Sequence, residues 1–177
     1  MDYSTIIKAY DVRGIFPDEF DEEAAGRIGA AFAAFVGTGE VIVGHDCRMS
    51  SPPLREALID GITTQGVDVR LIGEIPTDVL YYASGAMSLP GVVITASHNP
   101  AQYNGLKFCK AGAAPIGADT GLEDIRAMAE SGLDPASTVG TVRRQDVIQG
   151  YVDHMISATG ATEISRLTVV ADGGNGM

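Results

Sequence analysis

Apolar residues along this chain recur with two periods that alternate from one segment to the next. Apolar positions three or four residues apart predict amphipathic helices, whereas short continuous apolar runs predict buried strands. The helical pattern covers residues 21–36, 52–64, 77–86, 118–130 and 145–158. The strand pattern covers residues 41–43, 67–72, 91–95 and 167–171. Strand–helix–strand units of this length predict an α/β fold in which helices cover both faces of a sheet.

Particular residues mark where these elements begin, turn or end. Ser51 is predicted to cap the second helix, with Pro52 at its first helical position. Segments 105–109 and 113–116 flank a Lys-Ala-Gly turn and predict a hairpin. Residues 131–140 contain Gly, Ser and Pro, which predict a loop.

The pattern divides the chain into a complete first domain and the beginning of a second. Residues 1–144 carry enough matched apolar faces for one layered core. Residues 145–177 carry one helix and one strand, and the strand runs into the glycine-rich turn 172–176. Such a turn normally leads into a helix, and no helical pattern follows. We therefore expect 145–177 to be the opening helix and strand of a truncated second α/β domain.

Composition and charge limit the classes of partner. Apolar residues make up 45% of the 177 residues and charged residues 20%, which is typical of a folded globular protein. The formal net charge is −11, and no cluster of Lys or Arg exceeds a pair. We therefore expect no binding to nucleic acid or to an anionic membrane.

Targeting patterns and cysteines favour a cytoplasmic protein. The first residues show no basic segment followed by an apolar one, so no secretory signal is expected. No run approaches the roughly 18 apolar residues that a membrane span needs. Cys47 and Cys109 lie far apart, without CxxC spacing and without a histidine at a metal-ligand interval. We interpret both as reduced structural thiols and expect a cytoplasmic location.

The segment GVVITASHNP, residues 91–100, is the strongest candidate for a chemical site. A buried-type strand ends there, and the turn that follows carries Ser97 and His98. In open α/β sheets, ligands lie beyond the carboxyl ends of strands. The Asn104-Gly105 turn returns the chain so that Lys107 could reach the same place. An ordinary capped turn with a solvent-facing serine and histidine explains the same residues, and both interpretations stay open.

Two kinds of chemistry are considered for Ser97. A serine hydrolase needs a G-x-S-x-G elbow and a distant histidine base, but this serine lies between alanine and histidine. Adjacent side chains tend to point apart, and His154 lies on a predicted helix surface. Phosphoryl transfer fits better, because it needs positive and donor groups around a phosphate. Lys107, His98, Arg13 and backbone amides could hold a phosphorylated serine.

Two further segments place charged residues near predicted strands. Tyr10, Asp11 and Arg13 lie in AYDVRGIF, where an edge strand with a surface salt bridge is an equally good interpretation. Asp46 and Arg48 lie in VGHDCRMSSP, where we favour a loop ion pair followed by a helix cap. A third segment, the C-terminal residues ADGGNGM, lacks the G-x-G-x-x-G spacing of a dinucleotide-binding site.

In this order and spacing, these segments resemble the α-D-phosphohexomutase superfamily, in particular its bacterial phosphomannomutase/phosphoglucomutase branch. TASHNP is the most specific of them, and together they span nearly the whole chain. The residues that carry the resemblance are YDVRGI at 10–15, GHDCR at 44–48, SSP at 50–52, TASHNP at 95–100, YNGLK at 103–107 and DGGNG at 172–176.

The resemblance implies a fold, an activity and a set of site residues. The fold would be the layered mixed sheet of the superfamily's first domain, with helices on both faces, followed by the start of a second domain. The activity would interconvert the 1-phosphate and 6-phosphate of mannose or glucose through a bisphosphorylated sugar. Ser97 would carry the phosphoryl group and, once phosphorylated, would be a ligand of Mg²⁺. His98, Lys107 and Arg13 would surround the phosphoserine, and Tyr10 would contact the substrate.

The resemblance is incomplete, which leaves an alternative open. The family's D-G-D-x-D-R metal loop, its third-domain sugar loop and its fourth-domain phosphate-clamping loop do not occur in this chain. We therefore expect an N-terminal portion, inactive alone, of a four-domain enzyme that is a monomer or a weak dimer. Its partners would be hexose phosphates and a hexose bisphosphate. The alternative is a non-catalytic module that binds a phosphosugar or a protein.

Overall fold

The computed structural model describes residues 2–160, 163 and 165–172 of the chain. The strands are β1 (Val12–Ile15), β2 (Glu40–His45), β3 (Asp68–Glu74), β4 (Gly91–Ile94), β5 (Tyr103–Lys110), β6 (Ala114–Pro115) and β7 (Val142–Arg144). The helices are α1 (Glu22–Val36), α2 (Ser51–Thr64), α3 (Thr77–Met87), α4 (Leu122–Ser131) and α5 (Ile148–Thr159), with a 3₁₀ helix η1 (Ala118–Thr120) before α4.

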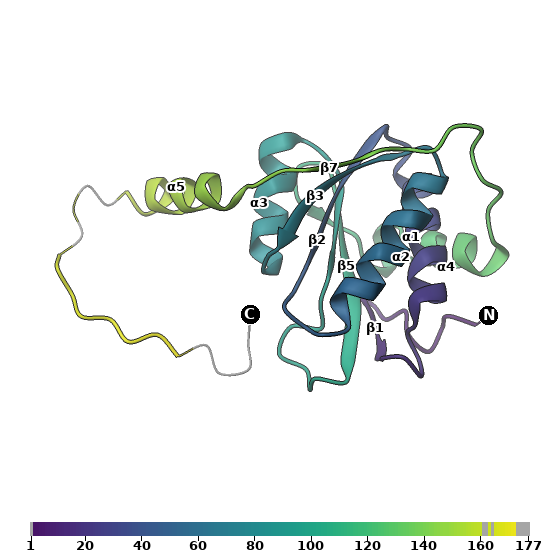
Figure 1. Cartoon of the computed structure of the whole chain (residues 1–177), viewed down its shortest axis with the longest axis horizontal. Helices are drawn as coiled ribbons and strands as arrows, with labels where there is room; N and C mark the ends of the chain where they lie inside the picture. The colour runs from purple at the N-terminus through teal and green to yellow at the C-terminus, as the bar shows by residue number, and fades with distance from the viewer. Residues whose placement is uncertain (1, 161–162, 164, 173–177) are drawn as a thin grey trace.

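The strands form one mixed sheet in the order β1-β5-β4-β2-β3-β7, with β6 paired to β5. Figure 1 labels β1, β5, β2, β3 and β7 of this sheet. The pairs β4–β2, β2–β3 and β3–β7 are parallel. α2 and α3 provide the crossovers from β2 to β3 and from β3 to β4, which parallel pairing requires. β5 is antiparallel to β1, β4 and β6. The predicted α/β class with a layered mixed sheet is confirmed.

Alternate residues of the central strands face opposite layers of helices. Val41 and Val43 of β2 belong to an apolar core that also contains buried residues of α1, α2 and α4. Ile42, between them, belongs to a second core formed with α3 and partly covered by Tyr151 of α5. Helices therefore cover both faces of the sheet, as predicted.

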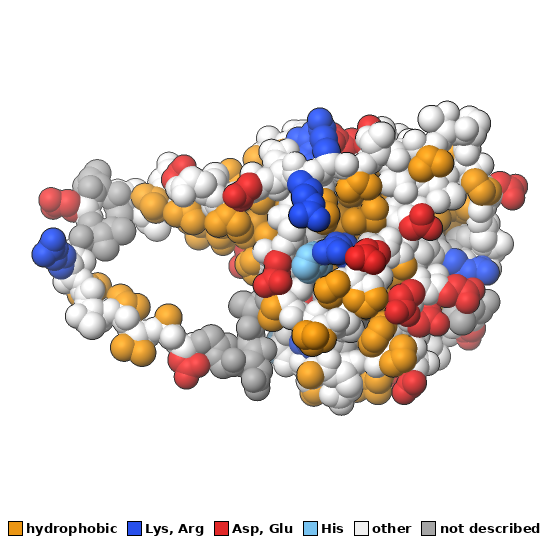
Figure 2. Space-filling view, in the orientation of Figure 1, with side chains coloured by type: hydrophobic (Ala, Val, Ile, Leu, Met, Phe, Trp, Pro, Cys, Tyr) orange, Lys and Arg blue, Asp and Glu red, His pale blue; other side chains and the backbone are white. Residues whose placement is uncertain are grey.

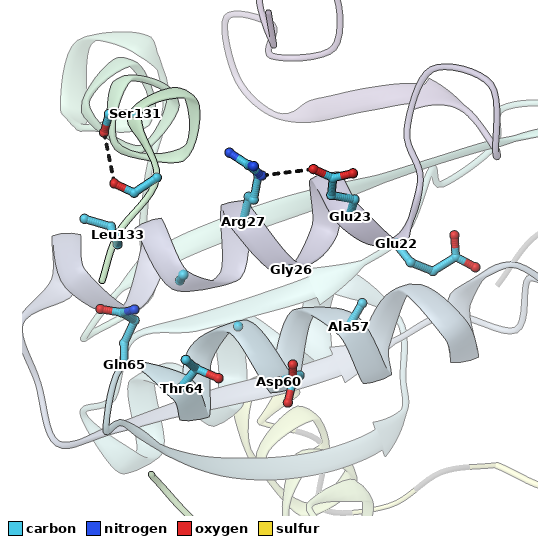
Figure 3. A pocket seen from close by; sticks show the side chains of 13 residues that line it. Glu22, Glu23, Gly26, Arg27, Ala57, Asp60, Thr64, Gln65, Ser131 and Leu133 are labelled. Carbon is cyan, nitrogen blue, oxygen red and sulfur yellow. Dashed lines mark hydrogen bonds and ion pairs between the residues drawn. The ribbon is translucent and has the colours of Figure 1, made fainter. Parts of the chain in front are cut away.

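Helices α1 and α2 approach each other closely. α1 begins after Asp21, whose carboxylate accepts a hydrogen bond from the amide of Ala24 at 2.8 Å. A Cβ at Gly61 would overlap the carbonyl oxygen of Gly26, so the contact requires glycine. At this contact, α1, α2 and residues 131–133 line a groove of about 560 Å³ (Figure 3). Its lining residues are separate from those of the site described below.

Strand β7 is an element that the apolar pattern does not predict. Its residues, Val-Arg-Arg, are all exposed, so no apolar run marks it. It pairs in parallel with β3, and both Arg70 and Arg143 donate hydrogen bonds to the Glu40 carboxylate. Burial alone would raise the pKa of Glu40, but these hydrogen bonds and charges outweigh burial and lower that pKa.

The C-terminal part of the chain departs most from the predicted elements. α5 forms close to the predicted helix and lies beside α3 (Figure 1). The strand predicted over 167–171 is not formed: residues 165–172 carry no strand, and their apolar side chains are exposed. A strand needs a neighbour for its backbone groups, and no described strand pairs with this segment. The glycines of the turn 172–176 lie outside the described residues, as does Asn175.

None of the described helices combines the length and the apolar character that a membrane span needs.

Candidate active site

The candidate site lies where two neighbouring parallel strands end. β2 and β4 pair in parallel, so their carboxyl ends meet at the same edge of the sheet. From β4 the chain enters residues 95–102, called here the Ser97 loop. From β2 it enters residues 46–50, called here the Asp46 segment. The amide of Asp46 donates to the carbonyl of Ile94 at 2.9 Å, which joins the two segments where they leave the sheet.

Local hydrogen bonds shape the Ser97 loop. The amide of Ser97 donates to Thr95 Oγ1 at 2.8 Å, and the amide of Asn99 donates to the Ala96 carbonyl at 3.0 Å. Ser97 has a φ of +53°, a left-handed conformation that costs a residue other than glycine about 1 kcal/mol or more. Such a conformation persists only where surrounding groups hold the backbone. Ser97 and His98 are exposed, so the serine hydroxyl is open to a ligand.

The geometry of Ser97 and His98 counts against a serine esterase. Ser97 Oγ lies 3.4 Å from His98 Nδ1, a long hydrogen bond that by itself does not distinguish an esterase from another use of the serine. In the part of the chain that the structure describes, no carboxylate hydrogen-bonds to His98 and orients it. His154 packs its ring against Tyr82 of α3, with centroids 5.3 Å apart. A triad around Ser97 is therefore not assembled by these histidines.

Strands β1 and β5 bring two of the predicted cations together beside the Ser97 loop. Arg13 pairs with Gly105 in the antiparallel register, and Lys107, two residues further, faces the same side of the sheet. Asp11 Oδ2 accepts from Arg13 Nη2 at 2.6 Å and from Lys107 Nζ at 3.0 Å. Arg13 Nη1 donates to Asn99 Oδ1 at 2.7 Å. The salt bridge expected of the edge strand is thus present, and it is attached to the loop.

Tyr10, the predicted substrate contact, lies one residue from this cluster. Its side chain is 82% exposed. No hydrogen bond links its hydroxyl to another residue in the described ranges. Tyr10 is therefore accessible to a ligand, but the fold does not join it to the Ser97 loop.

Arg48 makes hydrogen bonds that the sequence does not predict, in addition to its expected ion pair with Asp46. The predicted loop ion pair is present, with Arg48 Nε 3.1 Å from Asp46 Oδ2, and the Arg48 side chain is only 10% exposed. Its other two nitrogens donate to backbone carbonyls. These are the carbonyls of Ser97 at 2.7 Å and Asn99 at 2.6 Å for Nη2, and of Pro100 at 2.8 Å and Tyr103 at 3.0 Å for Nη1. One feature of the sequence could have indicated this contact with the Ser97 loop: Arg48 follows the end of β2, the strand next to β4.

A buried polar network holds the Asp46 segment in place. Asp46 is 1% exposed, and its Oδ1 accepts from the amide of Arg48 at 3.0 Å and from Ser51 Oγ at 2.5 Å. The side-chain amide of Asn104 on β5 donates to Ser50 Oγ at 2.8 Å and to Ser51 Oγ at 3.0 Å. Ser50, one residue earlier than predicted, is the N-cap residue of α2, and its side chain makes no capping hydrogen bond. The serines therefore tie α2 to β5 rather than cap the helix.

The two segments enclose a hollow of about 700 Å³. This volume falls in the range of roughly 300–1,000 Å³ that is usual for small-molecule sites. The lining residues are Asp46, Cys47, Arg48, Met49, Ser97, His98, Asn99, Pro100 and Ala101. A ligand in this hollow would lie directly against Ser97.

The described residues do not form a metal site of their own. No group of three or more His, Cys, Asp or Glu residues among them is arranged to hold a metal ion.

Comparison with known proteins identifies the family. The chain matches the family model for phosphoglucomutase/phosphomannomutase, alpha/beta/alpha domain I, over residues 4–134. The chain belongs to this family. The resemblance drawn from the sequence motifs is thereby confirmed, and the match covers β1 to α4 with the whole Ser97 loop.

Individual relatives of the family agree with this assignment. A phosphomannomutase from Escherichia coli is 40% identical over 97% of this chain and 39% of its own length. A protein of Xanthomonas campestris pv. campestris named phosphohexose mutases is also 40% identical, over 96% of this chain and 38% of its own length. A crystal structure of a phosphoglucomutase/phosphomannomutase family protein from Burkholderia thailandensis superposes with a TM-score of 0.79 at 33% identity, covering 89% of this chain and 36% of that one. The chain thus spans about two-fifths of the length of these curated relatives.

Proposed function

We propose that this chain carries the phosphoryl group of a phosphohexose mutase on Ser97. The observation that supports it most is the Ser97 loop itself. An exposed serine in a left-handed conformation lies at the edge of a hollow, on a loop that two arginines hold through hydrogen bonds. The substrates would be hexose 1-phosphates and 6-phosphates of mannose or glucose, with a hexose bisphosphate as the intermediate.

The proposed transfer exchanges one phosphorus–oxygen bond for another. The bond from phosphorus to Ser97 Oγ breaks while a bond from phosphorus to a hydroxyl oxygen of the hexose phosphate forms. The proton of that hydroxyl passes to solvent water, and the leaving serine oxygen takes up a proton, so the transfer consumes no net proton. His98 Nδ1, 3.4 Å from Ser97 Oγ, can supply that proton. The reverse transfer from the other end of the bisphosphate restores the phosphoserine.

The neighbouring cations suit the charge of a phosphoserine. A phosphorylated serine carries about −1.5 to −2 charges and three acceptor oxygens. Arg13 and Lys107 share the single Asp11 carboxylate, so this group of three has a net charge of +1. Positive groups around the transferring oxygens stabilise the charge that is redistributed during transfer. We assign Arg13 and Lys107 this role and Tyr10 a contact with the sugar.

A bound Mg²⁺ would add positive charge at the phosphoryl oxygens. Phosphorylated Ser97 would be its ligand from this chain, and its other ligands would come from outside the described residues. The cytoplasm is the proposed compartment, because charged sugar phosphates do not partition into a bilayer unaided.

The simplest experiment looks for the phosphate. Intact-mass and peptide mass spectrometry of the gene product that contains these 177 residues should find a phosphoryl group on Ser97. Ser97→Ala should abolish mutase turnover, whereas Ser157→Ala, at an exposed serine on α5, should leave it unchanged. Unmodified Ser97 together with full activity of Ser97→Ala would refute the proposal. Unmodified Ser97 with hexose phosphate still bound would instead identify the non-catalytic binding module.

We further propose that residues from 145 onward begin a second domain, as the sequence pattern predicts. The support is the apolar surface that α5 leaves exposed, which appears as a row of hydrophobic side chains along this helix (Figure 2). These residues are Ile148, Val152, Met155 and Ile156. Amide hydrogen exchange in this chain should be fast over 165–172 and slow over β4. Equally slow exchange in both segments of a dilute monomer would show that the boundary is misplaced.

A further inference from the structure

The side chain of Arg48 has every donor occupied. An arginine carries five N–H groups in a rigid plane. In Arg48 one donates to the Asp46 carboxylate and the others to four backbone carbonyls between Ser97 and Tyr103, all at 3.1 Å or less. We propose that Arg48, oriented by Asp46, is the positioning residue that sets the conformation of the Ser97 loop. This inference rests on the proposed function for its catalytic consequence, although its structural part can be tested alone.

The carbonyl acceptors of Arg48 begin at Ser97 itself and continue along the chain after it. Nη2 binds the carbonyl of Ser97 itself and that of Asn99, two residues later. Holding the Ser97 carbonyl fixes the peptide that follows Ser97, while the bond from its amide to Thr95 fixes the peptide before it. These two constraints together maintain the left-handed conformation of Ser97 and hence the direction of its hydroxyl.

The guanidinium is itself held in one orientation. Asp46 lies almost fully buried, and its second oxygen is engaged by Ser51 and by the Arg48 amide. Through Ser51 the network continues to Asn104 on β5. Arg48 is therefore anchored to the start of α2 and to the strand that follows the loop. A fixed anchor of this kind gives the loop one conformation rather than several.

Because its donors are occupied, Arg48 is also not expected to bind a phosphate directly. A phosphate bound by Arg48 would have to displace a carbonyl or the Asp46 carboxylate, because no N–H group is unused. Its charge is balanced by Asp46, so this pair adds no net charge to the site. Arg48 therefore acts through the backbone of Ser97 and not on the phosphoryl group.

Lysine and arginine differ at such a site. A lysine carries three donors on one nitrogen and cannot reach acceptors that the planar fork of an arginine spans. Arg48→Lys keeps the charge next to Asp46, which favours folding, but loses most of the carbonyl contacts. Arg48→Met removes both. Arg27→Met is the matched control, because Arg27 is a half-exposed arginine of α1 whose ion pair is with Glu23 on the same helix.

Amide hydrogen exchange on this chain tests the structural part. The amides of Ser97, Asn99 and Tyr103 donate hydrogen bonds within residues 95–103. In Arg48→Lys and Arg48→Met these amides should exchange at least about tenfold faster than in the parent, since a hydrogen bond to a charged group contributes this much or more. Amides of β4 should change less than about twofold in Arg48→Lys. Arg27→Met should change neither segment. Loop exchange that stays at the parent rate in Arg48→Lys would overturn the proposal, even if Arg48→Met fails to fold.

Kinetics of the gene product test the catalytic part. Misplacement of Ser97 should lower kcat of Arg48→Lys by about 100-fold while KM for the hexose phosphate changes little, because Arg48 does not touch the sugar. A rise in KM with unchanged kcat would overturn the positioning role. If Ser97 carries no phosphate in the parent protein, the proposed function fails, and the exchange data still decide whether Arg48 sets the loop conformation.

Discussion

Arg13 and Arg48 both donate hydrogen bonds to the Ser97 loop, yet their surroundings differ. Arg48 lies under the loop, 10% exposed, with all of its N–H groups engaged by Asp46 and backbone carbonyls. Arg13 is 21% exposed, reaches the loop mainly through the side chain of Asn99, and shares the Asp11 carboxylate with Lys107. Arg48 has no N–H group left for a ligand, and the charge of Asp46 balances its own. Arg13 belongs to a cluster with an excess positive charge.

This difference suits the two arginines to different tasks: Arg48 to ordering the loop and Arg13 to attracting an anionic ligand. A guanidinium whose donors all meet backbone carbonyls contributes order, because any ligand must compete with several existing hydrogen bonds. A cation that shares its carboxylate with a second cation keeps electrostatic attraction for a further anion. We therefore expect substitutions at Arg13 and Arg48 to give distinct signatures, although both residues contact the same loop.

Within the cluster of Arg13, Lys107 and Asp11, the larger effect is expected at Arg13. Arg13→Met should lower kcat/KM of the gene product for a hexose phosphate by about 100-fold, because it removes the positive donor that we propose for the transferring phosphoryl group. Exchange of the Ser97 loop amides should rise much less than in Arg48→Lys, since the backbone contacts of Arg48 remain. Steady-state kinetics and amide exchange on the same proteins check both parts.

Arg27→Met again serves as the control for the Arg13 substitution, because it removes an arginine remote from the loop. If Arg13→Met loosens the loop as much as Arg48→Lys does, the two arginines share one structural role. The distinction between holding and binding would then be lost.

A smaller effect is expected at Asp11. Asp11→Asn removes the negative charge that Arg13 and Lys107 share, so affinity for inorganic phosphate should rise about three- to tenfold. The gain should shrink as the salt concentration is raised, because the site is partly open to solvent. Isothermal titration at two ionic strengths measures both quantities. Asp18→Asn, at an exposed aspartate, should change neither. Weaker phosphate binding by Asp11→Asn would mean that Asp11 mainly orients the two cations.

Most of the fold was predictable from local patterns. The apolar period places α1 within one residue of where it is found, and the apolar runs predict β2, β3 and β4. β7 was missed because Val142–Arg144 has no apolar face and forms only by pairing with β3. The segment 167–171 has a strand-like sequence but no strand, since a strand depends on its neighbour as much as on its own residues.

The candidate site was predictable in its residues more than in its geometry. Ser97 and His98 follow from a polar turn at the end of a buried strand. That Arg13 and Lys107 meet at one carboxylate depends on the antiparallel register of β1 and β5. Tyr10 remains a prediction, because its side chain is exposed and its hydroxyl makes no hydrogen bond within the described part of the chain.

The sequence by itself determined the class of fold, the motif at Ser97 and the family to which the chain belongs. These depend on residue type and on spacing along the chain, which a single sequence contains in full. Only the tertiary structure decided what Arg48 does, because its acceptors lie about fifty residues away and are backbone carbonyls, which every residue has. Which carbonyls meet a given side chain depends on strand order and register. Both follow from how the whole core packs, and not from any local pattern.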